Sequence, residues 1–456
     1  MSFNFHSCHR EQTLLLPPDM IEWLPEDHVV WFIFDSVEAM DLSKFYQSYR
    51  ADGLGNTAYE PSMMVELYIY AYSKGIRSSR RIEALCEDDV GARVITGNQK
   101  PDHATLARFR QKHEKALKGL LSESLGLCFR SGMGKVGIMA LDGTKMKANA
   151  SGQANRTYEQ LKQQVSEWFD ELDEQDRRED EIYGKNKRGD VIPEDLRDAD
   201  TRRQWIRERL KEMQKANEAQ AEEKQKAIEK RKREEQQTGK KKRGRKPHPP
   251  DPDPPDSAKI NVTDPDSGIM KTANGFIQGY NAQAMVSEDQ LFLGMDVTRE
   301  KNDRNQLHPM LEEARQTIKH AEISTRLTAV AADAGYWSEK NVNELSEEDP
   351  ECYIAVQKGS KQRRALADKD PPRGRIPKDA TPKYLMERKL RTKKGKGVYG
   401  KRGQMVEAVF GQMKENLGFR GFLRRGINAV TSEWSFMGAV MNLMKLRLNK
   451  MAFTGG

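Results

Sequence analysis

Two aspartates stand in contexts that could support metal-assisted chemistry. Asp142 directly follows the apolar stretch KVGIMAL (135–141), and Asp333 follows LTAVAA (327–332). The carboxyl ends of neighbouring parallel strands form one crevice, so we expect the two carboxylates to meet there. Donor sets made only of oxygen suit Mg²⁺ or Mn²⁺ and do not suit zinc. The pair therefore predicts a divalent-cation site, although an Asp before Gly, as at Asp142, is also a common turn residue.

Phosphodiester cleavage is the chemistry open to such a site. Two divalent ions roughly 3.5–4 Å apart can activate a water molecule and stabilise a leaving 3′ oxygen. The second ion needs a third acidic ligand, and Glu407 is the candidate, on a helix after a segment rich in Lys and Arg. Asp296 and Glu415 are rival ligands. Asp264 and Asp266 lie in a Pro-containing turn and are expected to be turn residues.

The composition narrows the class of protein. The 456 residues carry a net charge of +8, and 32% of them are charged, so part of the chain is expected to be solvated helix or linker. No apolar run predicts a membrane span, and the first thirty residues lack the pattern of a secretion signal. The four scattered cysteines fit reduced thiols in a cytoplasm. The segment 358–402 has a net charge of +13, which indicates either a solvated loop or a phosphate-binding surface.

Hydrophobic periodicity predicts the order of the core elements. Strands are expected at 135–141, as a hairpin over 268–300, at 326–338 and at 351–359. Helices are expected at 305–323, 404–419 and 432–450. This order is typical of an α/β, ribonuclease-H-like catalytic core with a helical insertion after its first strand.

The chain divides into five predicted segments. They are a helical N-terminal DNA-binding domain (1–130), the first part of the ribonuclease-H-like core (131–150), a helical, coiled-coil-like insertion (151–238), a basic and Pro-rich linker (239–258), and the rest of the catalytic domain with C-terminal helices (259–456). Helical spacing within the insertion predicts two antiparallel helices.

Basic residues in the N-terminal domain and the linker are candidate DNA contacts. The short N-terminal helices with an Arg-bearing face suggest a helix-turn-helix-like module. Its candidate contacts, which could instead form a solvated helix face, are Arg77, Arg80, Arg81, Arg108 and Arg110. In the linker, Arg243 and Arg245 flank a glycine, a pattern that can lie in a narrow A·T minor groove. Because the motif is short, a plain basic linker is the favoured explanation of these two residues.

Several blocks of the sequence resemble bacterial insertion-sequence transposases of the DDE type, in the group with a Tyr-Arg-Glu-Lys signature. The blocks are ALDGTKMKANAS (140–151), INVTDPDSG (260–268), GFIQGYNAQ (275–283), AADAGYWS (331–338) and VYGKRGQMVEAVFGQMKENLGFRGFLRRG (398–426). YEPSMMVELYIYAYSKGIRSSRRIE (59–83) and KPDHATLARFR (100–110) resemble the N-terminal domain of that group. The resemblance covers nearly the whole chain, and the order of the blocks makes it specific.

The resemblance implies a metal-binding triad of Asp142, Asp333 and Glu407 that holds two Mg²⁺ or Mn²⁺ ions. Beyond the first of these acids, Lys145 is placed to meet a phosphate. Trp337 could stack on a base displaced from the duplex, or it belongs to the core.

The resemblance also implies that Tyr399, Arg402 and Lys414 contact phosphates near the transposon end. The Tyr–Arg and Glu–Lys spacings match the group, whereas Arg402 and Glu407 are one residue further apart than usual. On a continuous helix these two side chains would lie about 140° apart. Either Arg402 precedes the helix, with Gly403 as the break, or its role differs.

A DNA transposase is the function that the resemblance implies. As a homodimer it would bind the terminal inverted repeats of its element, hydrolyse phosphodiester bonds and join the freed 3′ ends to target DNA. Its partner would be double-stranded DNA, with no membrane association, and its location the bacterial cytoplasm, on the nucleoid when active. Two alternatives stay open: a DNA-binding regulator without activity, and a ribonuclease-H-like nuclease without strand transfer.

Overall fold

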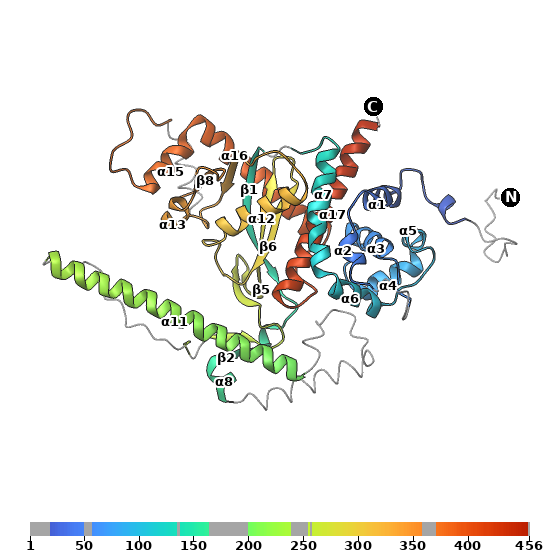
Figure 1. Cartoon of the computed structure of the whole chain (residues 1–456), viewed down its shortest axis with the longest axis horizontal. Helices are drawn as coiled ribbons and strands as arrows, with labels where there is room; N and C mark the ends of the chain where they lie inside the picture. The colour runs from blue at the N-terminus through green and yellow to red at the C-terminus, as the bar shows by residue number, and fades with distance from the viewer. Residues whose placement is uncertain are drawn as a thin grey trace, which may run out of the picture.

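A mixed sheet of six strands lies at the centre of the protein (Figure 1). The computed structural model describes residues 19–49, 57–134, 137–163, 199–238, 254–255, 258–357 and 371–454. The strands are β1 (Ile138–Lys147), β4 (Gly268–Thr272), β5 (Gly275–Ser287), β6 (Phe292–Thr298), β7 (Ala329–Ala332) and β8 (Glu351–Ile354). Their order is β4-β5-β1-β7-β8, and β6 also pairs with β5. The predicted α/β class is confirmed.

Strand β1 extends further than its apolar run predicts. Its antiparallel pairing with β5 continues to Lys147, which lies opposite Gly279. Its parallel pairing with β7 stops earlier, where Leu141 lies opposite Ala332. The prediction that Asp142 ends the strand is therefore wrong: this residue lies within β1, one position beyond the last parallel pair.

The predicted hairpin over 268–300 contains three strands. β4 and β5 pair antiparallel and turn between Thr272 and Gly275. β5 then pairs antiparallel with β6. The first stretch of the predicted hairpin is thus a hairpin by itself, which makes β5 the strand that joins β4, β6 and β1.

Three long helices pack on this sheet. Helices α12 (Leu307–His320) and α17 (Ile427–Thr454) pack along β6, and α16 (Lys393–Gly411) crosses β1 and β7. Helix α16 begins before the predicted start at 404, because Thr392 caps it by accepting a hydrogen bond from the Gly395 N–H at 2.9 Å. Shorter helices, α13 (Glu339–Asn343) and α15 (Pro382–Arg391), flank β8.

The N-terminal helices share one hydrophobic core with the sheet. They are α1 (Val29–Glu38), α2 (Ser43–Tyr46), α3 (Pro61–Ser73), α4 (Ser79–Asp88), α5 (Val90–Ile95), α6 (His103–Lys112) and α7 (Glu114–Arg130), after a 3-10 turn (Ile21–Trp23). Helices α6 and α7 meet at His113. Asp102 caps α6 by accepting a hydrogen bond from the Thr105 N–H at 2.7 Å. Helix α7 packs against α17 (Figure 1).

The chain between β1 and β4 forms a separate helical excursion. Strands β2 (Asn155–Thr157) and β3 (Lys259–Asn261) pair beside α8 (Tyr158–Gln163), and the 40-residue helix α11 (Ala199–Thr238) projects along one side (Figure 1). A small hydrophobic core contains Leu161, Ile206, Ile260 and Val262. Helix α11 confirms the second of the two expected helices. The first was expected from the spacing of Tyr158 to Leu172: α8 forms its start, and the rest lies outside the described residues. No helix in the described ranges is both long and apolar enough to cross a bilayer.

Asp264 lies in the turn expected of it but is fully buried. The Tyr280 hydroxyl donates to its two carboxylate oxygens at 2.7 and 2.8 Å, and the Gly426 N–H donates at 3.3 Å. Burial raises the pKa of Asp264 to about 6, although the Tyr280 hydrogen bond opposes that shift. Asp266 accepts a hydrogen bond from the Ile427 N–H at 2.9 Å. The turn therefore anchors the returning chain to the start of α17.

The free energy of unfolding should fall as Asp264 ionises. A carboxyl whose folded pKa lies above its unfolded value stabilises the fold fully below the unfolded pKa, and this contribution is lost as pH rises through the folded pKa. For a rise from 3.8 to about 6 the loss is roughly 3 kcal/mol. Urea unfolding measures this: between about pH 4 and 6, the free energy of unfolding of the native chain should fall by that amount relative to that of Asp264→Asn. If the difference in unfolding free energy between the native chain and Asp264→Asn stays the same across this pH range, the raised pKa of Asp264 is wrong.

Candidate active site

The pairing of β1 with β7 brings Asp142 and Asp333 side by side. Leu141 lies opposite Ala332 in the parallel register; Asp142 is the next residue of β1, and Asp333 is the first residue after β7. Neighbouring strands are about 4.8 Å apart. Burial raises the pKa of Asp142, the charge of Asp333 acts in the same direction, and Arg402 opposes both. The expected meeting of the two carboxylates is therefore present in the fold.

Helix α16 carries Arg402 and Glu407 across these strands. The Arg402 Nη1 lies 2.7 Å from Oδ2 of Asp142, and its Nη2 lies 3.7 Å from Oε1 of Glu407. The helix continues through Gly403, so Arg402 does not precede it, and its long side chain spans the angular offset. The Glu407 side chain is 72% exposed, whereas that of Arg402 is 14% exposed. One guanidinium therefore lies between two of the three predicted metal ligands.

Lys414 joins the end of α16 to β1. It lies in the π-helical turn Gln412–Asn416 and donates a hydrogen bond to the Thr144 hydroxyl. Thr144 and Asp142 are two residues apart, so their side chains share one face of the strand. Burial lowers the pKa of Lys414, and the charge of Asp142 opposes that shift. Tyr399 of α16 is partly buried and packs on the main core.

The donor chemistry at these strands fits a divalent cation in part. Asp142 and Asp333 offer oxygen ligands from adjacent positions, and the guanidinium of Arg402 already brings positive charge to this pair. Within the described residues, no three His, Cys, Asp or Glu side chains lie close enough to hold a metal ion together. Glu407 stands on the other side of Arg402. The site thus has two adjacent carboxylates and a third acid separated from them by a cation.

The structure adds a fourth acid that the sequence did not single out. Asp303 lies between β6 and α12, with its Oδ1 3.5 Å from the Nζ of Lys145. Burial lowers the pKa of Lys145, and the neighbouring carboxylates oppose that shift. The loop sequence KNDRN (301–305) has no apolar run before the acid. Nothing in the sequence therefore distinguished it from the other charged loop residues.

Arg77 and Arg110 lie in the interior, contrary to the prediction that they contact DNA. Their exposed fractions are 9% and 2%. Arg77 Nη1 forms an ion pair with Oε1 of Glu433 at 2.9 Å and donates to the Gly421 carbonyl at 3.0 Å. Arg110 donates to the Arg77 carbonyl at 2.9 Å and to Ser79 Oγ at 2.5 Å. Arg77 therefore joins the N-terminal helices to the segment after α16, whereas the hydrogen bonds of Arg110 stay within the N-terminal helices and the loop between α3 and α4.

The other predicted DNA contacts have different positions. Arg81 and Arg108 are exposed on α4 and α6, and Arg80 is half-buried on α4. Trp337 is half-buried and packs against the main core with part of its side chain accessible. The two linker arginines lie outside the described residues: Arg243 and Arg245.

The two rival acids have other partners. Asp296 lies on β6, where burial raises its pKa and the charge of Lys118 on α7 opposes that shift. Glu415 forms an ion pair with Arg420, and both side chains are 66% exposed. Neither contact places its acid beside Asp142, whose ion-pair partner is Arg402.

Two parts of the chain match family models of transposases. Residues 18–112 match a transposase domain (DUF772), and residues 255–443 match a transposase DDE domain. The chain is a transposase of the DDE type. No curated protein and no solved structure matches it. The DDE match includes Asp333 and Glu407 and begins after Asp142, which lies on β1, before the helical excursion.

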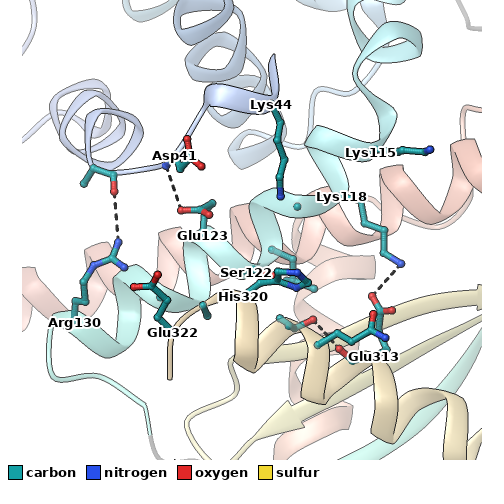
Figure 2. A pocket seen from close by; sticks show the side chains of 17 residues that line it. Asp41, Lys44, Lys115, Lys118, Ser122, Glu123, Arg130, Glu313, His320 and Glu322 are labelled. Carbon is teal, nitrogen blue, oxygen red and sulfur yellow. Dashed lines mark hydrogen bonds and ion pairs between the residues drawn. The ribbon is translucent and has the colours of Figure 1, made fainter. Parts of the chain in front are cut away.

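The transposase also has a cleft of about 670 Å³ between α7 and α12 (Figure 2). Lys44, Lys115 and Lys118 lie along it together with Glu123 and Glu313. One of these lysines, Lys118, forms an ion pair with Glu313 at 3.0 Å. The lining of this cleft contains none of the acids of the candidate active site. Charges of both signs line the cleft, which does not favour a phosphate-binding role for it.

Replacing Arg77 should destabilise the transposase. In Arg77→Gln, Glu433 loses its buried cation, and breaking a buried ion pair from one side costs about 3–5 kcal/mol. Urea unfolding measures this loss. Arg81→Gln, on the exposed surface of α4, should change the free energy of unfolding by no more than about 0.5 kcal/mol. Equal stability of the two variants would show that the buried pair does not support the fold.

Proposed function

We propose that this transposase cleaves and joins DNA strands at the terminal inverted repeats of its own insertion sequence. The catalytic core is proposed to be ribonuclease-H-like. Its support is the strand order, in which antiparallel β6 and β5 precede β1 and parallel β7 and β8 follow it. The excursion between β1 and β4 leaves this order intact.

The adjacency of Asp142 and Asp333 is the observation that carries this proposal. Two ionised carboxylates held close together repel each other, so the pair is unfavourable in a fold without a cation to share. Such pairs cluster at functional sites. The pair lies where the parallel strands end and where α16 brings Arg402, Glu407 and the following Lys414 across the sheet. This is an open arrangement that a DNA backbone can approach.

Asp142, Asp333 and Glu407 are the proposed metal ligands. When bound, two Mg²⁺ or Mn²⁺ ions would supply an activated nucleophile and positive charge for the leaving 3′ oxygen. Arg402 and Lys414 place fixed positive charge beside the first aspartate, where they can bind phosphate oxygens. Further candidate DNA contacts at this site are Tyr399, Lys145 and Trp337.

DNA recognition is assigned to surfaces away from the acids. The five-segment division (1–130, 131–150, 151–238, 239–258 and 259–456) stays our proposal for the chain. Exposed Arg81 and Arg108, with Arg80 beside them, support a DNA-facing side of α4 and α6. Arg243 and Arg245 of the linker are proposed to contact the minor groove. A homodimer that holds both element ends, in the cytoplasm on the nucleoid, completes the proposal.

Loss of any proposed ligand should abolish strand cleavage. Asp142→Asn, Asp333→Asn and Glu407→Gln keep side-chain size but remove a negative oxygen donor. Since changes around a metal ligand already cost about 10–100-fold, loss of the ligand should cost at least about 100-fold. The measurement is Mg²⁺-dependent cleavage of duplex DNA that carries the inverted repeats, followed on denaturing gels.

Two rival acids serve as matched controls for this experiment. Asp296→Asn and Glu415→Gln should cleave at nearly the native rate. If all three ligand variants cut as well as the native chain, the triad is assigned wrongly. Pre-cleaved ends with a free 3′-hydroxyl test joining separately: cleavage without a joined product would indicate a nuclease. Repeat binding by a native chain that never cleaves would indicate a regulator.

A further inference from the structure

Asp303 reaches from its loop into the strands that carry the proposed metal ligands. Its Oδ1 accepts hydrogen bonds from Nδ2 of Asn281 at 2.7 Å and from Nε2 of Gln283 at 2.8 Å. The Nζ of Lys145 lies 3.5 Å from the same oxygen. The Asp303 side chain is 22% exposed. Donors from β1 and β5 therefore converge on one carboxylate.

Two glycines leave the space that this carboxylate occupies. A Cβ at Gly143, the residue after Asp142, would lie 2.7 Å from Oδ1 of Asp303. A Cβ at Gly335, two residues after Asp333, would lie 3.1 Å from its Oδ2. Real Cβ atoms essentially never approach to the first distance, so a side chain at Gly143 would displace the carboxylate. The Asp303 carboxylate thus fills the space that a side chain would take after each of the two aspartates, at Gly143 and at Gly335.

A series of hydrogen bonds links Asp303 through Gln283 to the loop that follows Asp333. Gln283 Nε2 also donates to Oδ1 of Asn281 at 3.0 Å, and its Oε1 accepts from the Tyr336 hydroxyl. Tyr336 lies three residues after Asp333 and is fully buried. The network is therefore fixed at both ends: at the loop carrying Asp303, and at the buried tyrosine in the turn after β7.

We propose that Asp303 is a positioning residue that sets the separation of Asp142 and Asp333, and that it is not itself a metal ligand. This inference rests on the proposed metal-dependent function. The Oδ1 is already occupied by two amide donors and a lysine. The negative charge and the shape of Asp303 act on the ligands through Gly143 and Gly335.

Two substitutions separate charge from shape. In Asp303→Asn, the amide carbonyl can still accept from Asn281 and Gln283, but the ion pair with Lys145 is lost. Asp303→Ala also removes the carboxyl group that fills the space beside Gly143 and Gly335. Asn281→Ala leaves the carboxylate and removes one of its donors, so it reports on the network if the other variants fail to fold.

Binding of Mn²⁺ alone, followed by electron paramagnetic resonance without DNA, tests the proposal. Asp303→Asn and Asp303→Ala should bind the native number of ions, about 10–100-fold more weakly, which is the usual effect of residues that orient metal ligands. Asn281→Ala should show a smaller loss in the same direction. Asp303→Asn should also keep the native melting temperature. If Asp303 had only a structural role, weaker binding of Mn²⁺ would be accompanied by a lower melting temperature. Asp296→Asn is the control and should bind Mn²⁺ as the native chain does.

Each other outcome overturns a distinct claim. If the Asp303 variants bind fewer ions, as Asp142→Asn is expected to do, then Asp303 is a ligand and the positioning role is wrong. If they bind with native affinity, the network does not act on the metal site. If the native chain binds no Mn²⁺, the proposed metal-dependent function fails, and this inference fails with it.

Discussion

The parallel register of β1 and β7 is the constraint on which the candidate active site depends. Because Leu141 lies opposite Ala332, the next residues, Asp142 and Asp333, lie at the same level of the sheet. A shift of one residue would turn Asp142 to the other face of β1, since side chains alternate along a strand. The antiparallel pairing with β5, from Met139 to Lys147, resists such a shift over nearly the whole strand. The sheet therefore fixes the acids before any cation arrives.

The electrostatics of the site follow from that adjacency. Burial and the charge of Asp333 both raise the pKa of Asp142, so the ionised pair is destabilised without a nearby cation. Arg402 provides such a cation at 2.7 Å, and Lys414 follows at Thr144 on the same face of the strand. The same two basic residues can meet a DNA phosphate. Charge balance in the folded protein and substrate binding thus use the same side chains.

Local patterns predicted the two aspartates and most of the strands and helices near them, but not the contacts that complete the site. Asp142 and Asp333 each follow a buried apolar run, which is visible in a single sequence. Asp303 has no such mark, because its role depends on donors from β1 and β5. Arg77 was expected on a surface. Its ion-pair partner, Glu433, lies far along the chain, and no local pattern in the sequence reveals such a pair. The early start of α16 was missed because its glycines disfavour helix, and packing on the sheet overrides that preference.

Glu433 shows how the N-terminal helices and the catalytic strands become one body. Its carboxylate accepts hydrogen bonds from the Arg77 guanidinium and, at 3.1 Å, from the backbone N–H of Leu423. In the same segment, the Phe422 N–H donates to the carbonyl of Lys147, the last residue of β1, at 2.8 Å. The segment between Lys414 and α17 is therefore held at once by the N-terminal helices and by the strand that carries Asp142. Because Arg77 and Glu433 are both buried, the ion pair that joins these parts of the chain is shielded from water.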